Sequence, residues 1–420
     1  MSRCPVLPVP ARLLGLAGLA TALTIAVAGP VGATPVTLAV GPALAQRTAP
    51  GCASAPAPAR PVTEAPWPHL RYAPDRLAPL ATGAGVTVAV IDSGVDRRHP
   101  QLAGRVLDGS DFLDRPGDGT RDCAGHGTGV ASIIAAAPRP GIAFRGLAPE
   151  ARILPVRVSE QQVVDGQESG RTVEAAEFAR AIRWAVDRGA QVLNLSVVLY
   201  ADDPAVREAV AHAVDRDVVV VAAAGNLHGS GDPVPYPAAY EGVLGVGALT
   251  PAGSRADFSQ TGPHVDLVAP GSDVLLAVPG QGHRSADGTS YATPFVAATA
   301  ALVRQYRPDL TGAEVARRIV ATVDPAPGGS ADGYGAGVLN PYRAIVETAL
   351  SPHPSGSPAA GLPDDLADPE VVVRQARRAR AEKRATLVAS GAAAVVTVAV
   401  LTALVLPRGV RRRWRPAGSA

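Results

Sequence analysis

Between about residue 81 and residue 348, short β-branched runs alternate with alanine-rich amphipathic stretches. The runs expected to form strands are 86–92, 151–158, 190–199, 218–226, 243–249 and 264–271, and the expected helices are 126–137, 174–189, 204–217 and 290–306. Strand, helix and strand in repetition predict an α/β fold with a parallel sheet and helices on both faces. The 420 residues are enough for one large domain or two ordinary ones, and 47% apolar residues can build a core.

Four polar residues stand where these elements begin or end. Asp92 ends the first strand and Asn226 ends the fourth, while His126 and Ser290 begin the first and last helices. Open parallel sheets bind ligands at the carboxyl ends of their strands, so we expect all four side chains at one rim. Each has a plain alternative: Asp92 and Asn226 fit a turn or cap, His126 fits an ordinary first helical residue, and Ser290 fits an N-cap.

Together, the four residue types predict a serine peptidase site. Ser290 would be the nucleophile and His126 the base that takes its proton, while Asp92 fixes the imidazole tautomer and stabilises the imidazolium. The Asn226 amide and the Ser290 backbone N–H would donate to the tetrahedral oxyanion, which the start of the last helix also favours.

The order Asp, His, Asn, Ser on alternating strands and helices resembles the subtilisin-like serine peptidases. The resemblance rests on the stretches VAVIDSGVDRRHP, GHGTGVASIIAA, VVVAAAGN, FSQTGPHVDLVAPG and GTSYATPFVAATAALV, and it covers residues 81–348. It implies a triad of Asp92, His126 and Ser290, with Asn226 as the oxyanion residue. His99 and His264 lie in matching segments outside the triad positions, and we expect them to be structural.

The N-terminus has the pattern of an export signal, residues 1–45. Arg3 and Arg12 precede an uncharged apolar run, and Ala43-Leu44-Ala45 offers a small-x-small cleavage site. Residues 26–28 are a second possible cleavage site, and an uncleaved anchor helix is the alternative to cleavage.

A second apolar run, residues 386–406, is long enough to cross a bilayer and has arginine clusters on both sides. A buried core helix is the alternative, although such charged flanks do not suit one. A Pro-rich and basic linker, 349–385, precedes the run, and an Arg-rich tail, 407–420, follows it. Because the export signal sends the preceding part across the membrane, we expect a single-pass protein in the cell membrane. Its catalytic domain would be extracytoplasmic and its tail cytoplasmic.

The cysteines and the extension at 46–80 belong to the exported part. Cys4 lies in the signal, which leaves Cys52 and Cys123 as an even pair in an oxidising compartment and predicts a disulfide. Two isolated buried thiols are the alternative. The extension is rich in Pro and Ala and is expected to be extended. It is too short for a folded inhibitory prodomain, so we expect it to stay attached near His126.

Export signal, extension with a cysteine, stalk, membrane span and Arg-rich tail together resemble the mycosins, membrane-anchored peptidases associated with type VII secretion in actinobacteria. That resemblance implies the membrane components of a type VII secretion machine as partners. Two departures from subtilisins concern the substrate groove. Val197, Val198 and Leu199 replace the usual Gly-Gly edge and are expected to narrow it, and Tyr291 replaces the usual Met.

The sequence thus predicts a membrane-anchored serine endopeptidase that cuts exported polypeptides with narrow specificity. The alternatives are a structural subunit that stabilises the secretion membrane complex, with proteolysis secondary, and a general subtilase shed by cleavage within 351–370. No cofactor is implied, and no acidic cluster has the ligand spacing of a metal site. The formal net charge of +2 gives no reason to expect a nucleic-acid partner.

Overall fold

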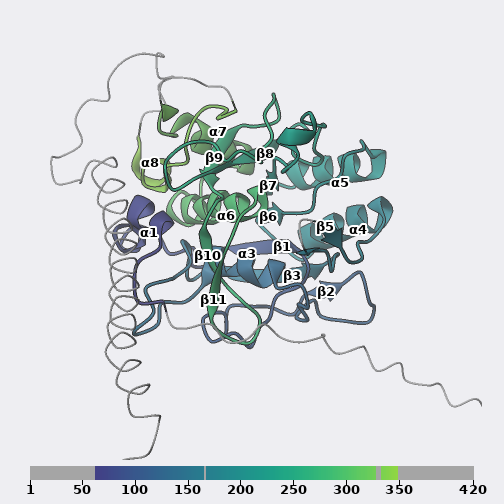
Figure 1. Cartoon of the computed structure of the whole chain (residues 1–420), viewed down its shortest axis with the longest axis horizontal. Coiled ribbons are helices and arrows are strands. Elements are labelled where there is room, and N and C mark those ends of the chain that lie inside the picture. Colours follow the sequence, from purple (N-terminus) through teal and green to yellow (C-terminus); the bar gives the residue numbers. More distant parts are fainter. Residues whose placement is uncertain (1–61, 165–166, 328–332, 349–420) are drawn as a thin grey trace, which may run out of the picture. The chain divides into compact units, whose positions relative to one another are not determined.

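The computed structural model describes residues 62–164, 167–327 and 333–348 (Figure 1). The predicted signal peptide, Cys52, the linker 349–385, the span 386–406 and the tail lie outside these residues. Within the described ranges, no helix is both long enough and apolar enough to cross a membrane.

The centre of the fold is a seven-stranded sheet in the order β2-β3-β1-β6-β7-β8-β9. The strands are β2 (Ser110–Asp111), β3 (Arg152–Arg157), β1 (Thr87–Asp92), β6 (Val192–Leu195), β7 (Val219–Ala223), β8 (Val243–Leu249) and β9 (Leu267–Pro270). Every neighbouring pair is parallel. The predicted α/β fold with a parallel sheet is therefore confirmed.

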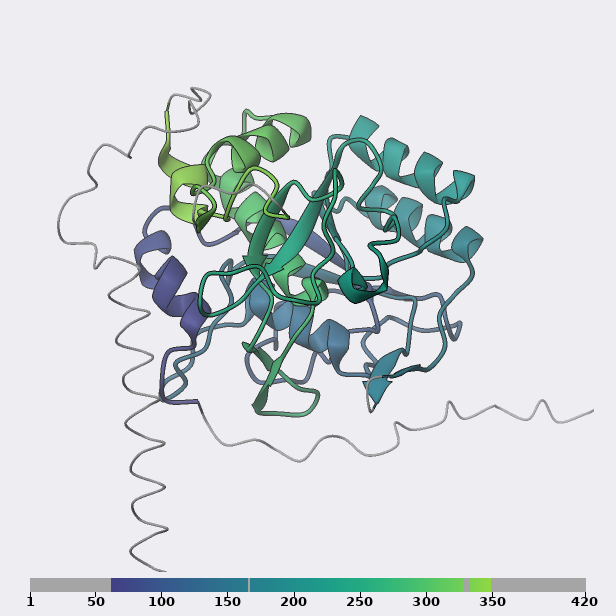
Figure 2. The same cartoon turned by 45° about the horizontal axis from the view of Figure 1, so that its top comes forward.

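Helices cover both faces of this sheet, as the sequence predicts (Figures 1 and 2). The helices α3 (His126–Ala135) and α6 (Thr289–Tyr306) lie on one face, and α4 (Ala175–Asp187) and α5 (Pro204–Asp215) lie on the other. Strand β1 shows the division, because successive side chains of a strand point to opposite faces. Val88 and Val90 pack in the core with α3 and α6, whereas Ala89 and Ile91 pack in the core with α4 and α5. Each of the buried valine and isoleucine side chains contributes about 1.5–3 kcal/mol relative to its exposed state.

Helix α6, which has Ser290 in its first turn, is buried along most of its length. Its residues are buried without interruption from Thr289 to Val303, which is the pattern of a helix apolar on all sides. The helix contacts five strands of the sheet, β1, β6, β7, β8 and β9, in addition to α3. Its first turn is therefore held rigidly against the rim where those strands end.

The remaining elements surround this core. They are the helices α1 (Trp67–Tyr72), α2 (Pro74–Leu77), α7 (Gly312–Ala321) and α8 (Pro341–Val346), the 3-10 helix η1 (His228–Ser230), and the antiparallel pairs β4 (Gln162–Val164) with β5 (Gln167–Ser169) and β10 (Val274–Ala277) with β11 (His283–Ala286).

The expectation that residues 46–80 are extended is wrong for 67–77, which form α1 and α2. Proline occurs in the first turn of both helices, where its missing N–H has no helical acceptor to lose. In this part of the extension, the prolines therefore mark the first turns of α1 and α2. Tyr72 and Leu77 belong to the core beneath α3 and α6, so this part of the extension packs on the domain that contains the sheet.

Candidate active site

Three predicted residues meet at the carboxyl rim of the sheet. Asp92 is the last residue of β1, His126 is the first residue of α3, and Ser290 lies in the first turn of α6. The His126 Nδ1 is 2.7 Å from Asp92 Oδ1, and its Nε2 is 2.9 Å from Ser290 Oγ. Because the carboxylate only accepts, Nδ1 carries the hydrogen, and Nε2 is left to accept the Ser290 hydroxyl.

Two glycines allow these elements to approach so closely. A Cβ at Gly127, the second residue of α3, would lie 2.1 Å from the backbone oxygen of Gly94, just beyond β1. Gly288 precedes α6 with φ of 152°, and a Cβ there would lie 3.0 Å from Ser290 Oγ. Glycine is therefore required on the helix that carries His126 and before the helix that carries Ser290.

Charges of both signs act on His126. Burial alone would lower the pKa of the imidazole, but the Asp92 charge and hydrogen bond, together with the charge of Asp122, raise it above its usual value against an opposing effect of Arg284. The His126 side chain keeps an exposed fraction of 26%, so it remains open to a substrate. Tyr291 packs beside it, with ring centroids 4.9 Å apart.

Asn226 lies in the loop after β7, where the chain reaches the same rim. Its Oδ1 accepts from both the backbone N–H and the hydroxyl of Thr289, each at 2.9 Å. These bonds fix the orientation of the amide. Within the described part of the chain, neither the Asn226 Nδ2 nor the Ser290 backbone N–H has a hydrogen-bond partner. Two donors therefore remain available, one on Ser290 itself and one on Asn226, which bonds the neighbouring Thr289. Sequence reasoning missed Thr289, although it lies inside the GTS motif.

The first turn of α6 has a further attachment to the sheet. Pro294 has no N–H, so the Ser290 carbonyl four residues earlier loses its helical donor. Ser196 Oγ, just beyond β6, lies 3.4 Å from that carbonyl oxygen and itself accepts from the buried Asn194 amide at 2.9 Å. A weak bond from the end of β6 thus replaces the missing helical one.

Val197, Val198 and Leu199 were expected to narrow the substrate groove, but two of them pack on the core instead. Val197 and Leu199 pack against the core of α4 and α5, and Leu199 exchanges backbone hydrogen bonds of 2.7 and 2.8 Å with Tyr236. Alternate residues of an extended segment point in opposite directions. Val198 is the one of the three that does not pack on this core, and it stays the residue expected to narrow the groove.

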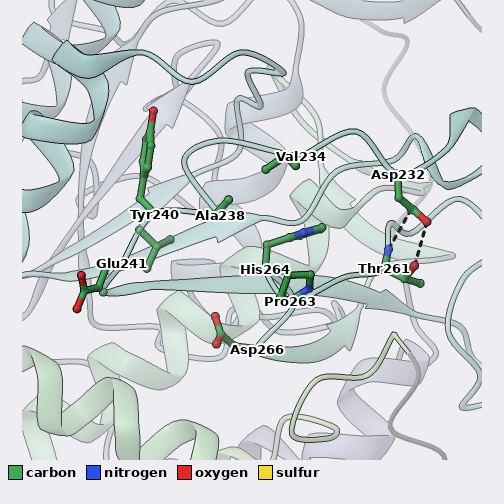
Figure 3. A pocket seen from close by; sticks show the side chains of 12 residues that line it. Asp232, Val234, Ala238, Tyr240, Glu241, Thr261, Pro263, His264 and Asp266 are labelled. Carbon is green, nitrogen blue, oxygen red and sulfur yellow. Dashed lines mark hydrogen bonds between the residues drawn. The ribbon is translucent and has the colours of Figure 1, made fainter.

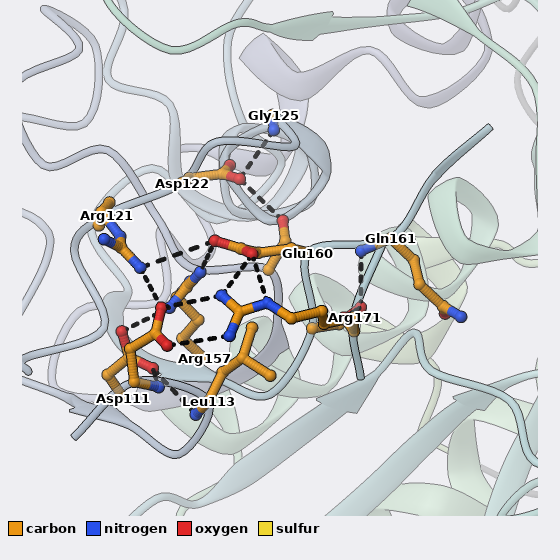
Figure 4. A network of polar contacts seen from close by, with 12 residues as sticks. Asp111, Leu113, Arg121, Asp122, Gly125, Arg157, Glu160, Gln161 and Arg171 are labelled. Carbon is orange, nitrogen blue, oxygen red and sulfur yellow. Dashed lines mark hydrogen bonds and ion pairs between the residues drawn. The ribbon is translucent and has the colours of Figure 1, made fainter. Parts of the chain in front are cut away.

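An ion-pair network lies at the end of β3, on the same rim, and extends from the buried Arg157 to the exposed Arg171 (Figure 4). Arg157 is fully buried and pairs with Asp111 at 2.6 Å, with Asp114 at 3.2 Å, and with Glu160. Arg171 also contacts Asp114 and Glu160, and its hydrogen bond holds the pKa of Asp114 well below the usual range. The network braces the loop that leads from β2 to α3. Sequence reasoning missed it because its members are far apart in the chain.

A separate cavity of about 460 Å³ contains none of the predicted triad residues (Figure 3). His264 and Asp266 line it, and Asp232 at its side accepts two hydrogen bonds from Thr261. Burial lowers the pKa of His264 and raises that of Asp266. His264 therefore lies apart from the triad, as expected, and we assign no chemistry to this cavity.

The other predicted residues are placed as follows. His99 is buried and has its Nε2 3.4 Å from the Gly282 carbonyl, outside the triad. Cys123 is disulfide-bonded, but its predicted partner Cys52 lies outside the described residues, so the pairing stays a prediction. No group of three or more metal-ligating side chains occurs in the part of the chain that the structure describes.

Comparisons with known proteins agree with this geometry. Residues 83–337 match the model of the subtilase family, peptidase family S8. Mycosin-1 of Mycobacterium tuberculosis (strain ATCC 25618 / H37Rv) is 35% identical over 72% of this chain and 78% of its own length. Subtilisin Savinase of Lederbergia lenta is 38% identical over 62% of this chain and 90% of its own. The solved structure of "a serine protease MycP1, an essential component of the type VII (ESX-1) secretion system" is 34% identical, covers 69% of this chain and 92% of that one, and has a TM-score of 0.59. The chain is therefore a serine protease of the subtilase family, similar in sequence and fold to the mycosins.

Proposed function

We propose that this chain is a membrane-anchored serine endopeptidase that cuts exported polypeptides with Asp92, His126 and Ser290. One observation carries the proposal: a single imidazole lies within hydrogen-bond distance of both the Asp92 carboxylate and the Ser290 hydroxyl. These contacts meet the requirement that the base reach the nucleophile while a third group orients the base.

The chemistry follows from these contacts. Ser290 Oγ attacks the scissile carbonyl carbon as its proton passes to His126 Nε2, and Asp92 stabilises the resulting imidazolium. His126 then gives that proton to the leaving amine as the C–N bond breaks. Water hydrolyses the Ser290 ester by the same route and regenerates the hydroxyl.

The carbonyl oxygen becomes negative in each tetrahedral intermediate. Asn226 Nδ2 and the Ser290 N–H are the donors we assign to it, assisted by the positive end of α6. In subtilisin, loss of the side-chain donor costs about 3–4 kcal/mol of transition-state stabilisation. We expect a similar dependence on Asn226.

The site also belongs to a larger arrangement in the cell envelope. We infer a signal peptide at 1–45, a peptidase domain at 81–348, and a membrane helix at 386–406 that keeps this domain outside the cytoplasm, with a Cys52–Cys123 disulfide holding the extension. The likeness to MycP1 supports membrane components of a type VII secretion machine as partners.

Fluorophosphonate labelling of the full-length chain, purified in detergent, tests the catalytic assignment. We expect one adduct, on the peptide that contains Ser290, and none after Ser290→Ala or His126→Ala. A folded chain that stays unlabelled up to about pH 9, while subtilisin labels in the same tube, would contradict the proposal.

The alternative is a structural subunit of the secretion complex. The intact contacts of His126 favour retained chemistry, but they do not exclude a second role. Ser290→Ala separates the two in the producing organism. If processing stops and secretion continues, the structural role is independent of the active site.

A further inference from the structure

A second buried carboxylate lies beside the proposed triad. Asp122 is in the loop just before α3 and has an exposed fraction of only 5%. Its Oδ1 accepts from Ser93 Oγ at 2.8 Å and from the Gly125 N–H at 2.7 Å. Its Oδ2 accepts from the N–H and the hydroxyl of Thr128, at 2.8 and 2.6 Å. One side chain thus receives four hydrogen bonds from three positions.

These partners are the chain neighbours of the triad. Ser93 directly follows Asp92, and Gly125 directly precedes His126. The Ser93 hydroxyl also accepts from the Gly127 N–H at 2.9 Å, so it donates to Asp122 and accepts from the residue after His126. The Asp122 carboxylate therefore connects the end of β1 to both sides of His126.

Asp122 also supplies what helix α3 lacks. The N-cap residue of α3 is Gly125, which has no side chain to bond the first helical N–H groups. Asp122 and Ser93 accept from Thr128 and Gly127 instead. A negative charge at a helix start is favourable, because the first N–H groups point toward it.

We propose that Asp122 is a positioning residue for the peptidase reaction: its carboxylate fixes His126 against Asp92, and its negative charge stabilises the imidazolium that forms when Ser290 attacks. This inference rests on the proposed triad. It adds a second carboxylate, without contact to the reacting atoms, to the one that already bonds His126.

The charges around the imidazole agree with this role. The groups that act on His126 are Asp92 from β1, Asp122 from the loop before α3 and Arg284 from β11, and Tyr291 of α6 packs against the ring. Burial raises the pKa of Asp122 to about 6, although its four hydrogen bonds oppose that shift. Asp122 is therefore mostly ionised above pH 7, where a serine peptidase needs neutral His126.

Two variants separate the charge from the geometry. Asp122→Asn removes the charge and one of the two carboxylate oxygens, each of which accepts two hydrogen bonds. Ser93→Ala breaks the link between β1 and α3 and keeps the charge. We would measure the second-order rate constant of fluorophosphonate labelling for the full-length chain in detergent from pH 5 to pH 9. The plateau reports the geometry of the site, and the acid midpoint reports the titration of His126.

We expect Asp122→Asn to lower the plateau about 10- to 100-fold, as small misplacements of catalytic groups do. We expect it also to move the acid midpoint down by about 0.5–1 pH unit, because a nearby negative charge has been lost. Ser93→Ala should lower the plateau and leave the midpoint unchanged. A purely structural role for Asp122 would lower the plateau without moving the midpoint.

An Asp122→Asn chain that labels with the parent's midpoint overturns the electrostatic part of the proposal. A plateau within about twofold of the parent for both variants overturns the positioning part. If Asp122→Asn shows no cooperative thermal transition, Ser93→Ala and Thr128→Val decide, and parent-like plateaus for both contradict the proposal. A parent chain that does not label at all contradicts the triad itself, and this inference then fails with it.

Discussion

Acid should destabilise the folded chain through His283 of strand β11. Its Nε2 is 2.6 Å from Gln101 Oε1, and the Gln101 amide nitrogen donates to two backbone carbonyls. Gln101 Oε1 is thus the acceptor, and His283 carries its hydrogen on Nε2. The Nδ1 is buried with no partner among the described residues, while the rings of Phe144 and His99 pack around it at 5.1 and 5.9 Å.

Protonation of Nδ1 would place a charge and an unpaired N–H in this apolar site. Burial, with a smaller effect of His99, therefore lowers the pKa of His283 to about 4. In the unfolded chain the group titrates near 6.5. A lowered folded-state pKa gives stability that is complete above about pH 6.5 and is lost as the pH falls toward 4. Linkage makes the loss about 2 kcal/mol at pH 5 and about 3 kcal/mol at pH 4.

Urea unfolding of the full-length chain in detergent, followed by tryptophan fluorescence between pH 7.5 and pH 4, measures this loss. A Ser290→Ala background prevents self-digestion. His283→Gln can still donate to Gln101 Oε1 and cannot gain a charge, so its stability should fall by about 2 kcal/mol less than the parent's by pH 5. His212→Gln on α5 removes an imidazole outside the cluster and should respond as the parent does. Parallel pH curves for the parent and His283→Gln would refute the reasoning.

Three further predictions concern single contacts. Asn226→Ala should lower kcat about 10²- to 10³-fold with little change in KM, since the donor acts on the transition state; an equal change in both would contradict this assignment. Arg157→Met should lower the free energy of unfolding by about 3–5 kcal/mol in urea, because the buried Asp111 carboxylate loses its arginine partner, and a loss below about 1 kcal/mol would show that the network is dispensable. Gly127→Ala should abolish labelling of Ser290, because its Cβ would meet the Gly94 oxygen at 2.1 Å, whereas Gly229→Ala, with open space around it, should label normally.

The sequence predicted the elements whose pattern is local. The strand at 86–92 and the helix at 290–306 were placed within a residue, because an uninterrupted apolar run and a glycine followed by a long apolar helix are strong signals. The four rim residues could be placed together because parallel strands bring their carboxyl ends to one edge.

The sequence could not show which distant side chains share a hydrogen bond or a charge. Asp122 lies four residues before His126 in a loop without a recognisable motif. Its proposed role depends on the hydrogen bond from Ser93, which is 29 residues away in the chain. Arg157 reads as an exposed strand residue until Asp111 and Asp114 are seen to surround it. Helix α1 was missed for another reason, since prolines mark both extended segments and helix starts.

The two groups of buried titratable residues predict two separate acid thresholds. The carboxylates near His126 raise its pKa, so the imidazole that we propose as the base is protonated at a higher pH than an ordinary histidine. His283 and His69 both pack against the Phe144 ring, and burial lowers the pKa of each to about 4. Unfolding therefore needs a lower pH than inactivation does. Near pH 5.5 the chain should be folded and silent, and a return to pH 8 should restore the full labelling rate of Ser290. Two results would show that inactivation and unfolding are a single transition. One is loss of the near-UV circular dichroism signal together with activity at pH 5.5, and the other is inactivation that does not reverse.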